Sequence, residues 1–283
     1  MKYFLIITNE TKDPNLTLTG QIQNYLITKG CKSRVVLRTP TRDDLAIEED
    51  ALKQAECVLV LGGDGTLLRA AREIAGRNIP ILGINLGTLG FLAEVEKNLV
   101  FQAIDQLLSG TYQTQKRMML CGDIYHEKQE KEISPALNDI TITRCGSLQI
   151  IRFSIYVNQQ FLCKMSADGI IIATPTGSTG YNMSAGGPIV EPGAEMIVLT
   201  PICAHTLNAR SIILKADDVI EIEIDQGRDG SNLVVEANSD GSEKMSMMTG
   251  DRIVIRKSSK TTSIIKLNEV SFVEALHRKM SDE

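Results

Sequence analysis

The spacing of apolar residues changes once along the chain, near residue 112, and this change limits the possible folds more than any other feature. Before it, short apolar runs at residues 2–8, 33–37, 57–61 and 79–84 alternate with segments in which apolar residues recur every three or four positions. Buried strands that alternate with amphipathic helices are typical of a parallel sheet with helices on both faces. We therefore expect residues 1–112 to form an α/β, Rossmann-like domain.

After residue 112, apolar and polar residues alternate one by one. The pattern is clearest in residues 219–225 (VIEIEID) and recurs in residues 151–157, where Asn158 and Gln159 are suited to a turn. Strict alternation predicts strands with one buried face, so we expect residues 113–265 to form an all-β, sandwich-like domain. Helical spacing returns at the end of the chain, and we expect residues 266–283 to form a helical segment that returns toward the first domain.

Composition narrows the ligand class. The net charge is −5 without any basic cluster, and the chain has no Trp, which argues against nucleic acid as a partner. No run of about 18 apolar residues occurs, so we expect no membrane association. The expected partner is a small molecule.

The cysteines and the start of the chain indicate a cytoplasmic protein. The six cysteines are scattered without a Cys-x-x-Cys pair, which argues against a zinc site or a disulfide framework. The first ten residues lack the basic start and cleavage site of a signal peptide. The three histidines (His126, His205 and His277) share no motif, and we interpret them as structural or surface residues.

The strongest local motif follows the third apolar run. It consists of Gly62, Gly63, Asp64, Gly65 and Thr66, directly before a helical segment. Open α/β sheets bind ligands at this junction, where glycines let a phosphate approach the backbone and the helix N-terminus attracts anions. A carboxylate here suits a metal ligand or a proton acceptor. The alternative is that Asp64 or Thr66 only caps the helix.

Three further segments are candidates for binding. Residues 83–91 (GINLGTLGF) form a second glycine-rich loop in which Phe91 is either a pocket wall or a core residue. Residues 168–182 (DGIIIATPTGSTGYN) lead from a buried strand into a loop of hydroxyls and glycines, where Tyr181 could stack on a base and Ser178 could instead cap a short helix. Asn138 and Asp139 combine an amide with a carboxylate, although such a pair is usually a turn.

Together, these segments resemble the NAD kinase family. The signature is the ordered set of GGDGTLL at 62–68, NLGTLGFLAE at 85–94, LND at 137–139 and DGIIIATPTGSTGYNMSAGGPIVEP at 168–192. The resemblance covers nearly the whole chain. Diacylglycerol kinases and phosphofructokinases share mainly the first motif, so the later ones make the assignment.

The resemblance implies transfer of the γ-phosphoryl group of ATP to the adenosine 2′-hydroxyl of NAD, giving NADP. It also implies a divalent cation, Mg²⁺ by preference, held through the phosphates, and a homodimer or homotetramer. The sequence differs from the family pattern at Ser166, Gly180 and Ser242. The differences at Ser166 and Ser242 leave open whether ATP or inorganic polyphosphate is the donor.

The resemblance also implies roles for individual residues. Asp64 would accept the proton of the 2′-hydroxyl, and the phosphate loop would consist of Gly62, Gly63, Gly65 and Thr66. The expected NAD-binding residues are Asp64, Gly65, Arg69, Phe91, Asn138, Asp139, Asp168, Thr176, Thr179, Gly180, Tyr181, Asn182, Met183 and Ser184.

Two rival functions make different predictions. A lipid or sugar kinase of the wider superfamily would have an acceptor without adenosine, so Asn138 and residues 168–182 would have no role in binding it. A dinucleotide sensor that has lost catalysis would have no use for Asp64 beside the ribose.

Overall fold

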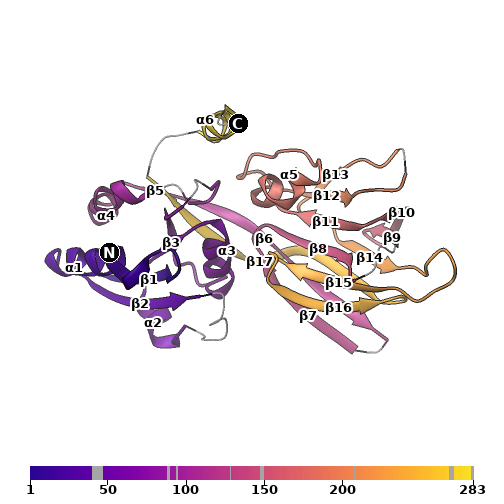
Figure 1. Ribbon diagram of the computed structural model, residues 1–283, viewed down its shortest axis with the longest axis horizontal. Coiled ribbons are helices and arrows are strands. Elements are labelled where there is room, and N and C mark those ends of the chain that lie inside the picture. Colours follow the sequence, from indigo (N-terminus) through magenta and orange to yellow (C-terminus); the bar gives the residue numbers. More distant parts are fainter. Residues whose placement is uncertain are drawn as a thin grey trace. The chain divides into compact units, whose positions relative to one another are not determined.

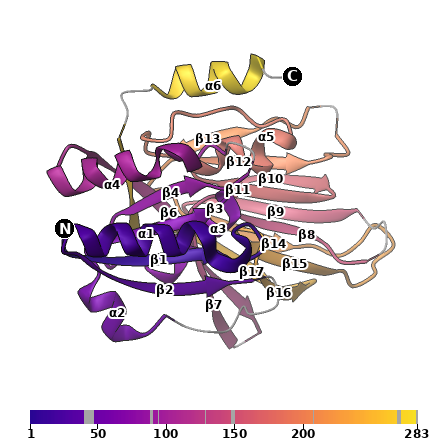
Figure 2. The ribbon, with the colours of Figure 1, turned by 60° about the vertical axis from the view of Figure 1, so that its left-hand side comes forward.

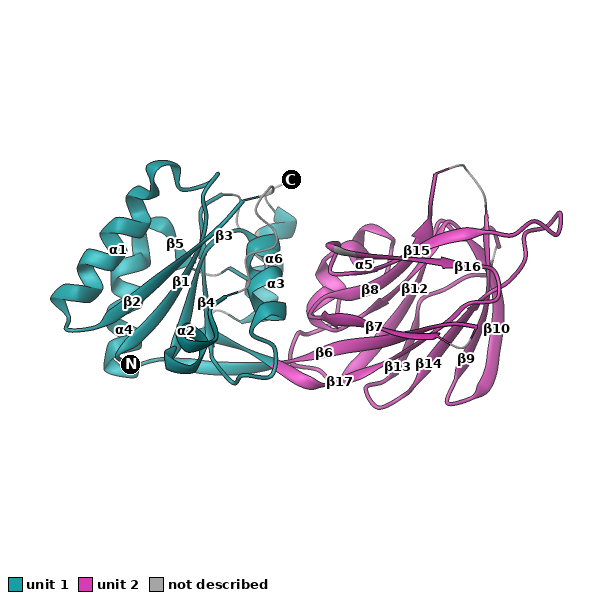
Figure 3. Ribbon diagram, turned by 90° about the horizontal axis from the view of Figure 1, so that it is seen from below, with its two compact units in different colours: residues 1–116, 262–283 teal, residues 117–261 magenta. Residues whose placement is uncertain are grey.

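The computed structural model describes residues 1–39, 47–87, 90–93, 95–127, 129–146, 150–206, 208–267 and 271–281, without the side chains of Glu243 and Arg278 (Figure 1). The chain divides into two compact units, which Figure 3 shows in different colours. Unit 1 contains residues 1–116 and 262–283, and unit 2 contains residues 117–261. No helix in the described part of the chain is long and apolar enough to cross a bilayer.

The sheet of unit 1 is built on four parallel strands in the order β2-β1-β3-β4. These are β1 (Tyr3–Asn9), β2 (Lys32–Arg38), β3 (Cys57–Gly62) and β4 (Ile81–Asn85). The short β5 (Val95–Glu96) pairs with β4, and Ile264 pairs in parallel with Ile81. Because the strands are parallel, their carboxyl ends lie at one edge, where Gly62 is the partner of Asn85.

Helices cover both faces of this sheet, as expected from the sequence. Figure 3 shows α1 (Thr17–Thr28) and α4 (Val100–Ser109) on one side and α3 (Asp64–Glu73) on the other. The short α2 (Glu49–Gln54) contacts β1. Apolar residues at helical spacing form the packed faces, as predicted: Leu18, Ile22 and Leu26 of α1 and Val100, Ala103, Ile104 and Leu107 of α4 share a core with β1, β3 and β4. The remaining elements of unit 1 are η1 (Pro14–Leu16), η2 (Lys97–Leu99) and α6 (Phe272–Ser281).

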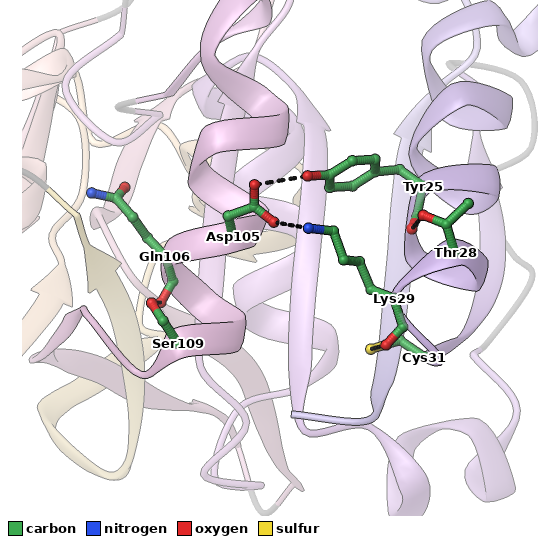
Figure 4. A network of polar contacts seen from close by, with 7 residues as sticks. All are labelled: Tyr25, Thr28, Lys29, Cys31, Asp105, Gln106 and Ser109. Carbon is green, nitrogen blue, oxygen red and sulfur yellow. Dashed lines mark hydrogen bonds and ion pairs between the residues drawn. The ribbon is translucent and has the colours of Figure 1, made fainter.

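Polar groups fix how α1 and α4 lie beside each other (Figure 2). Figure 4 shows the carboxylate of Asp105 accepting a hydrogen bond from the Tyr25 hydroxyl at 2.7 Å and pairing with Lys29 at 2.7 Å. The Tyr25 ring also meets Phe101 edge-on, with 5.0 Å between ring centroids. Exposed ion pairs contribute little stability, so apolar burial holds the helices and these contacts select their register.

Unit 2 is a sandwich of two mainly antiparallel sheets, which confirms the predicted change of architecture. One has the order β10-β9-β14-β17, with β6 paired to β17 and β7 paired to β6. Its strands are β6 (Gln113–His126), β7 (Gln129–Ala136), β9 (Ile151–Val157), β10 (Gln160–Ala167), β14 (Ile220–Ile224) and β17 (Arg252–Lys266). Asn158 and Gln159 have φ values of 51° and 66°, the left-handed conformation of a two-residue hairpin turn.

The second sheet of unit 2 has the order β13-β12-β11-β8-β15-β16. Its strands are β8 (Asp139–Arg144), β11 (Gly169–Ala173), β12 (Met196–Ile202), β13 (Ile212–Lys215), β15 (Val234–Ser239) and β16 (Glu243–Met248). Alternate residues of both sheets form one buried core. The connection from β11 to β12 carries η3 (Thr176–Thr179) and α5 (Tyr181–Ser184).

The start of α1 is stabilised by a carboxylate that lies before the helix. Buried Asp13 accepts hydrogen bonds from the backbone N–H of Leu18 at 3.0 Å and of Thr19 at 2.8 Å, and from the Thr19 hydroxyl at 2.6 Å. Burial favours a raised pKa for Asp13, but these hydrogen bonds outweigh it, so its pKa lies below the ordinary value. Asp13 therefore satisfies N–H groups that the first turn leaves without partners.

Replacing Asp13 with Ala is expected to lower the free energy of unfolding by about 1–2 kcal/mol, because buried N–H groups lose their acceptor. Urea unfolding followed by circular dichroism would measure the loss. The exposed Asp50, in the first turn of α2, offers a matched control as Asp50→Ala. Equal stability of the Asp13 and Asp50 variants would contradict the capping role.

Candidate active site

The first glycine motif is the junction between β3 and α3. Gly62 ends β3 and Gly63 precedes the first residue of α3, Asp64. A Cβ atom on Gly62 would lie 2.4 Å from Oγ1 of Thr66, so only glycine lets the first turn of α3 pack this closely on the strand end. The glycine loop therefore lies at the carboxyl edge of the sheet, where ligands bind in open α/β folds.

The carboxylate of Asp64 does not cap α3, which excludes that alternative for this residue. It reaches instead to the second glycine-rich loop. Oδ2 accepts a hydrogen bond from the N–H of Phe91 at 2.9 Å, and Oδ1 accepts from Leu92 and Ala93 at 3.3 Å each. A Cβ atom on Gly90 would lie 1.8 Å from Oδ1, so glycine is required for this contact. The two glycine loops are thus joined through Asp64.

A pocket of about 320 Å³ opens beside this junction. Two of its cations, Arg38 and Arg69, pair with Glu73 at 2.7 and 3.0 Å. The lining consists of Asn9, Lys12, Arg38, Thr39, Gly63, Asp64, Gly65, Thr66 and Arg69. Four of these residues were not predicted from the sequence: Asn9, Lys12, Arg38 and Thr39. Their position at or just after the ends of the first two strands was the available signal.

Phe91 is half-buried and is not among the buried core residues, which argues against the core interpretation. It is also not among the residues that line the pocket beside Asp64, so its role as a pocket wall stays a prediction. The ammonium of Lys279 in α6 lies 4.1 Å from the centroid of its ring. Burial lowers the pKa of Lys279, while the nearby charge of Asp64 acts in the opposite direction. Lys279 belongs to no motif, so it could not be predicted as a neighbour of Phe91. Three residues of the second motif, Thr88, Leu89 and Glu94, lie outside the described residues.

In unit 2, a second carboxylate holds the LND motif. Asp240 accepts hydrogen bonds from the N–H groups of Leu137, Asn138 and Asp139 at 2.9, 2.7 and 3.2 Å. This contact spans more than a hundred residues of sequence, so local pattern could not reveal it. It fixes the backbone from which the side chains of Asn138 and Asp139 project.

The hydroxyl-rich loop after β11 packs directly against this motif. Thr174 donates to the carbonyl of Leu137 through its hydroxyl at 2.6 Å and to that of Asn138 through its N–H at 2.8 Å. A Cβ atom on Gly177 would lie 2.1 Å from the Asn138 carbonyl oxygen. In the described structure, Oδ1 of Asn138 and Oγ1 of Thr176 are buried without a hydrogen bond.

The rest of the loop divides into buried supports and exposed side chains. Ser178 is not a helix cap, because its hydroxyl contacts Pro175 and Val190. Asn182 is fully buried and bonds to Ser178, Pro188 and Thr200, so it supports the loop from inside. Thr179 and Gly180 are half-buried, whereas the exposed side chains are those of Tyr181, Met183 and Ser184.

Asp168 lies at the other end of β11 from this loop. The five residues of that strand separate the two by roughly 16 Å at 3.3 Å per residue. Asp168 is flanked by Arg144 at 3.4 Å and by His205 at 3.3 Å. His205 therefore contacts a candidate binding residue. This contact could not be predicted from the sequence, because His205 belongs to no motif.

Comparison with known proteins agrees with this geometry. The sequence model of the ATP-NAD kinase N-terminal domain matches residues 4–112, and that of the ATP-NAD kinase C-terminal domain matches residues 137–267. This chain belongs to the NAD kinase family. It is 46% identical to the NAD kinase of Agathobacter rectalis over 100% of this chain and 99% of that protein. The NAD kinase of Lachnoclostridium phytofermentans is 43% identical, with 100% of both chains covered.

Solved structures of the NAD kinase family share the fold. Yeast NADH kinase complexed with NADH has a TM-score of 0.87 at 23% identity, over 99% of this chain and 88% of that one. An NAD kinase from Archaeoglobus fulgidus in complex with ATP has a TM-score of 0.78 at 22% identity, over 99% of both chains.

One family-motif residue, Asp139, has a strongly shifted pKa. Burial, reinforced by the charge of Asp240, raises the pKa of Asp139 from 3.8 to about 7. The unfolded chain loses this proton near pH 4, whereas the folded chain keeps it to about pH 7. The folded state therefore loses stability as the pH rises through this window, and bears the full cost of ionisation above it.

Replacing Asp139 with Asn is expected to remove this penalty. At pH 8 the variant should have a higher free energy of unfolding than the wild type, by up to a few kcal/mol at about 1.4 kcal/mol per pKa unit, and therefore a higher unfolding temperature, with little difference near pH 4. Thermal unfolding across pH 4–8 would measure it, with Asp217→Asn as the control because its side chain is 90% exposed. A difference that stays constant with pH would contradict the proposed burial cost.

Proposed function

We propose that this chain phosphorylates NAD at the adenosine 2′-hydroxyl with the γ-phosphoryl group of ATP, releasing NADP and ADP. Membership of the NAD kinase family supports the reaction. The observation that carries the proposal is the position of the Asp64 carboxylate, fixed by three backbone N–H groups beside the cation-lined pocket at the sheet edge.

The role proposed for Asp64 is to accept the proton of the attacking hydroxyl. A carboxylate has about four lone-pair positions, and three N–H donors leave one for the hydroxyl. As the bond from the 2′-oxygen to the γ-phosphorus forms, the bond from that phosphorus to the ADP oxygen breaks, and the proton passes to Asp64. Because phosphoryl transfer is loose, holding the hydroxyl in line supplies most of the acceleration.

A divalent cation, Mg²⁺ by preference, fits the donor chemistry, because it neutralises charge on the transferred phosphates when bound. Among the described residues, no group of three or more acidic, His or Cys side chains converges as a metal cage. Of the described residues that line the pocket, Asp64 is the only family-motif carboxylate, and its oxygens already accept N–H bonds. We therefore infer that the phosphates themselves supply most of the ligands.

The NAD-binding roles follow the two groups of residues described above. In unit 1 we assign Gly65, Arg69 and Phe91 to the adenosine side of the acceptor, with Gly62, Gly63 and Thr66 in the phosphate loop. In unit 2 we assign Asn138, Asp139, Asp168, Thr176, Thr179, Gly180, Tyr181, Met183 and Ser184 as contacts. For Asn182 we propose a supporting role, since its amide is wholly engaged inside the loop.

Compartment and assembly are part of the same proposal. We propose a cytoplasmic enzyme, and the six free cysteines suit a reducing compartment. We also propose a homodimer or homotetramer, which light scattering would test. Inorganic polyphosphate is the alternative donor.

The decisive experiment incubates the purified protein with ATP, Mg²⁺ and NAD, and detects NADP with an NADP-specific dehydrogenase. Parallel reactions replace ATP with polyphosphate. The wild type is expected to form NADP, whereas Asp64→Asn should lose at least about a hundredfold in kcat, because a general base typically contributes this much. Retained binding of NAD and ATP in the variant would separate lost chemistry from a displaced loop. NAD binding without NADP from either donor would favour the sensor interpretation.

Gly90→Ala tests the contact that joins the two glycine loops. The added Cβ would overlap the Asp64 carboxylate, so NADP formation should fall at least tenfold although the residue itself need not touch a substrate. Gly20→Ala is the matched control, because nothing lies within 4 Å of its added Cβ and alanine favours the helix α1. Equal activity of the two variants would show that the position of Asp64 is not critical.

A further inference from the structure

Lys12 is a charged residue of the pocket to which neither the sequence motifs nor the proposed reaction assigns a task. Its backbone is tightly held in the turn after β1. The carbonyl of Asn9 accepts the N–H of Lys12 at 3.0 Å, and the Asn9 side chain accepts both the N–H and the hydroxyl of Thr11. On the other side, Asp13 is fixed to the first turn of α1. The turn therefore positions the start of the Lys12 side chain.

The ammonium of Lys12 reaches both glycine loops at once. A Cβ atom on Gly63 would lie 2.8 Å from its Nζ, and a Cβ atom on Gly87 would lie 3.4 Å from it. These glycines follow the neighbouring strands β3 and β4, and Lys12 follows β1 on the other side of β3. The ammonium thus occupies space at the sheet edge that any side chain at Gly63 would have to share.

The ammonium of Lys12 is available to bind an anionic ligand. In the described parts of the chain, no carboxylate forms an ion pair with Lys12, and the residue is exposed. Two acidic groups at the pocket have partners of their own, since Glu73 binds Arg38 and Arg69, and Asp64 accepts N–H bonds from the second loop. A lysine over a glycine loop, next to a helix N-terminus, is a favourable environment for a phosphate.

We propose that Lys12 binds the terminal phosphate oxygens of the phosphoanhydride donor, in the pocket beside Asp64. The inference rests on the proposed function for the identity of the reaction. ATP and inorganic polyphosphate present the same terminal phosphates, so both can use this cation. Lys12 forms no bond with phosphorus; its charge offsets the negative charge that the donor brings to the glycine loop.

The test measures donor binding directly, by calorimetric titration of ATP and, separately, of inorganic tripolyphosphate. Lys12→Met should weaken the binding of both by about tenfold to a hundredfold, the usual effect of losing a charged hydrogen bond. Lys12→Arg should retain part of the affinity, because it keeps the charge. NAD affinity should stay unchanged. The variant should fold, since Lys12 is exposed, and thermal unfolding would check this.

Lys53→Met is the matched control, because Lys53 is an exposed lysine of unit 1 outside the pocket. Weakened tripolyphosphate binding with unchanged ATP binding would identify polyphosphate as the donor that Lys12 binds. Weakened ATP binding alone would mean that Lys12 acts on the nucleoside, and would overturn the proposal. Unchanged binding of both, or no binding by the wild type, would also overturn it. Absence of NADP from a wild type whose tripolyphosphate binding depends on Lys12 would refute the proposed function instead.

Discussion

The contact between one carboxylate and three backbone N–H groups determines the arrangement of the candidate active site in unit 1. Asp64 belongs to the first turn of α3, but its oxygens bind Phe91, Leu92 and Ala93, which follow the next strand of the sheet. Parallel pairing of β3 with β4 brings the two loops to the same edge, and Gly90 leaves room for the carboxylate. Sheet topology, glycine spacing and side-chain chemistry are therefore linked at a single residue.

The same kind of interaction recurs at two other sites, with different results. Asp13 holds the start of α1 and Asp240 holds the LND motif, each by accepting backbone N–H groups. Asp13 is buried in the scaffold, whereas Asp64 is half-buried and lines a pocket. Exposure to a ligand, rather than the hydrogen bonds themselves, distinguishes the candidate catalytic carboxylate from a structural one. The charge of Asp240 also raises the cost of ionising its neighbour Asp139.

Regular elements could be predicted because each is encoded by a local period. The strand alternation of β14 and the turn at Asn158 appear directly in the sequence. The site was only partly predictable, since its motifs indicate the loops but not their contacts. Nothing local distinguishes Asp64 from a helix cap, or the buried amide of Asn182 from a ligand contact. Lys12 and Lys279 have no motif, and only the folded chain brings them to the glycine loops.

The discontinuity of unit 1 has a consequence for how the protein is made. Its sheet receives Ile264, and its last helix is α6, but both follow the whole of unit 2 in the chain. A ribosome adds roughly 5–20 residues per second, so the first 116 residues wait roughly 7 to 30 seconds for the segment that completes their unit. During that interval the edge of β4 that later pairs with Ile264 lacks this neighbour. Protection of the nascent chain by chaperones would matter most in this period.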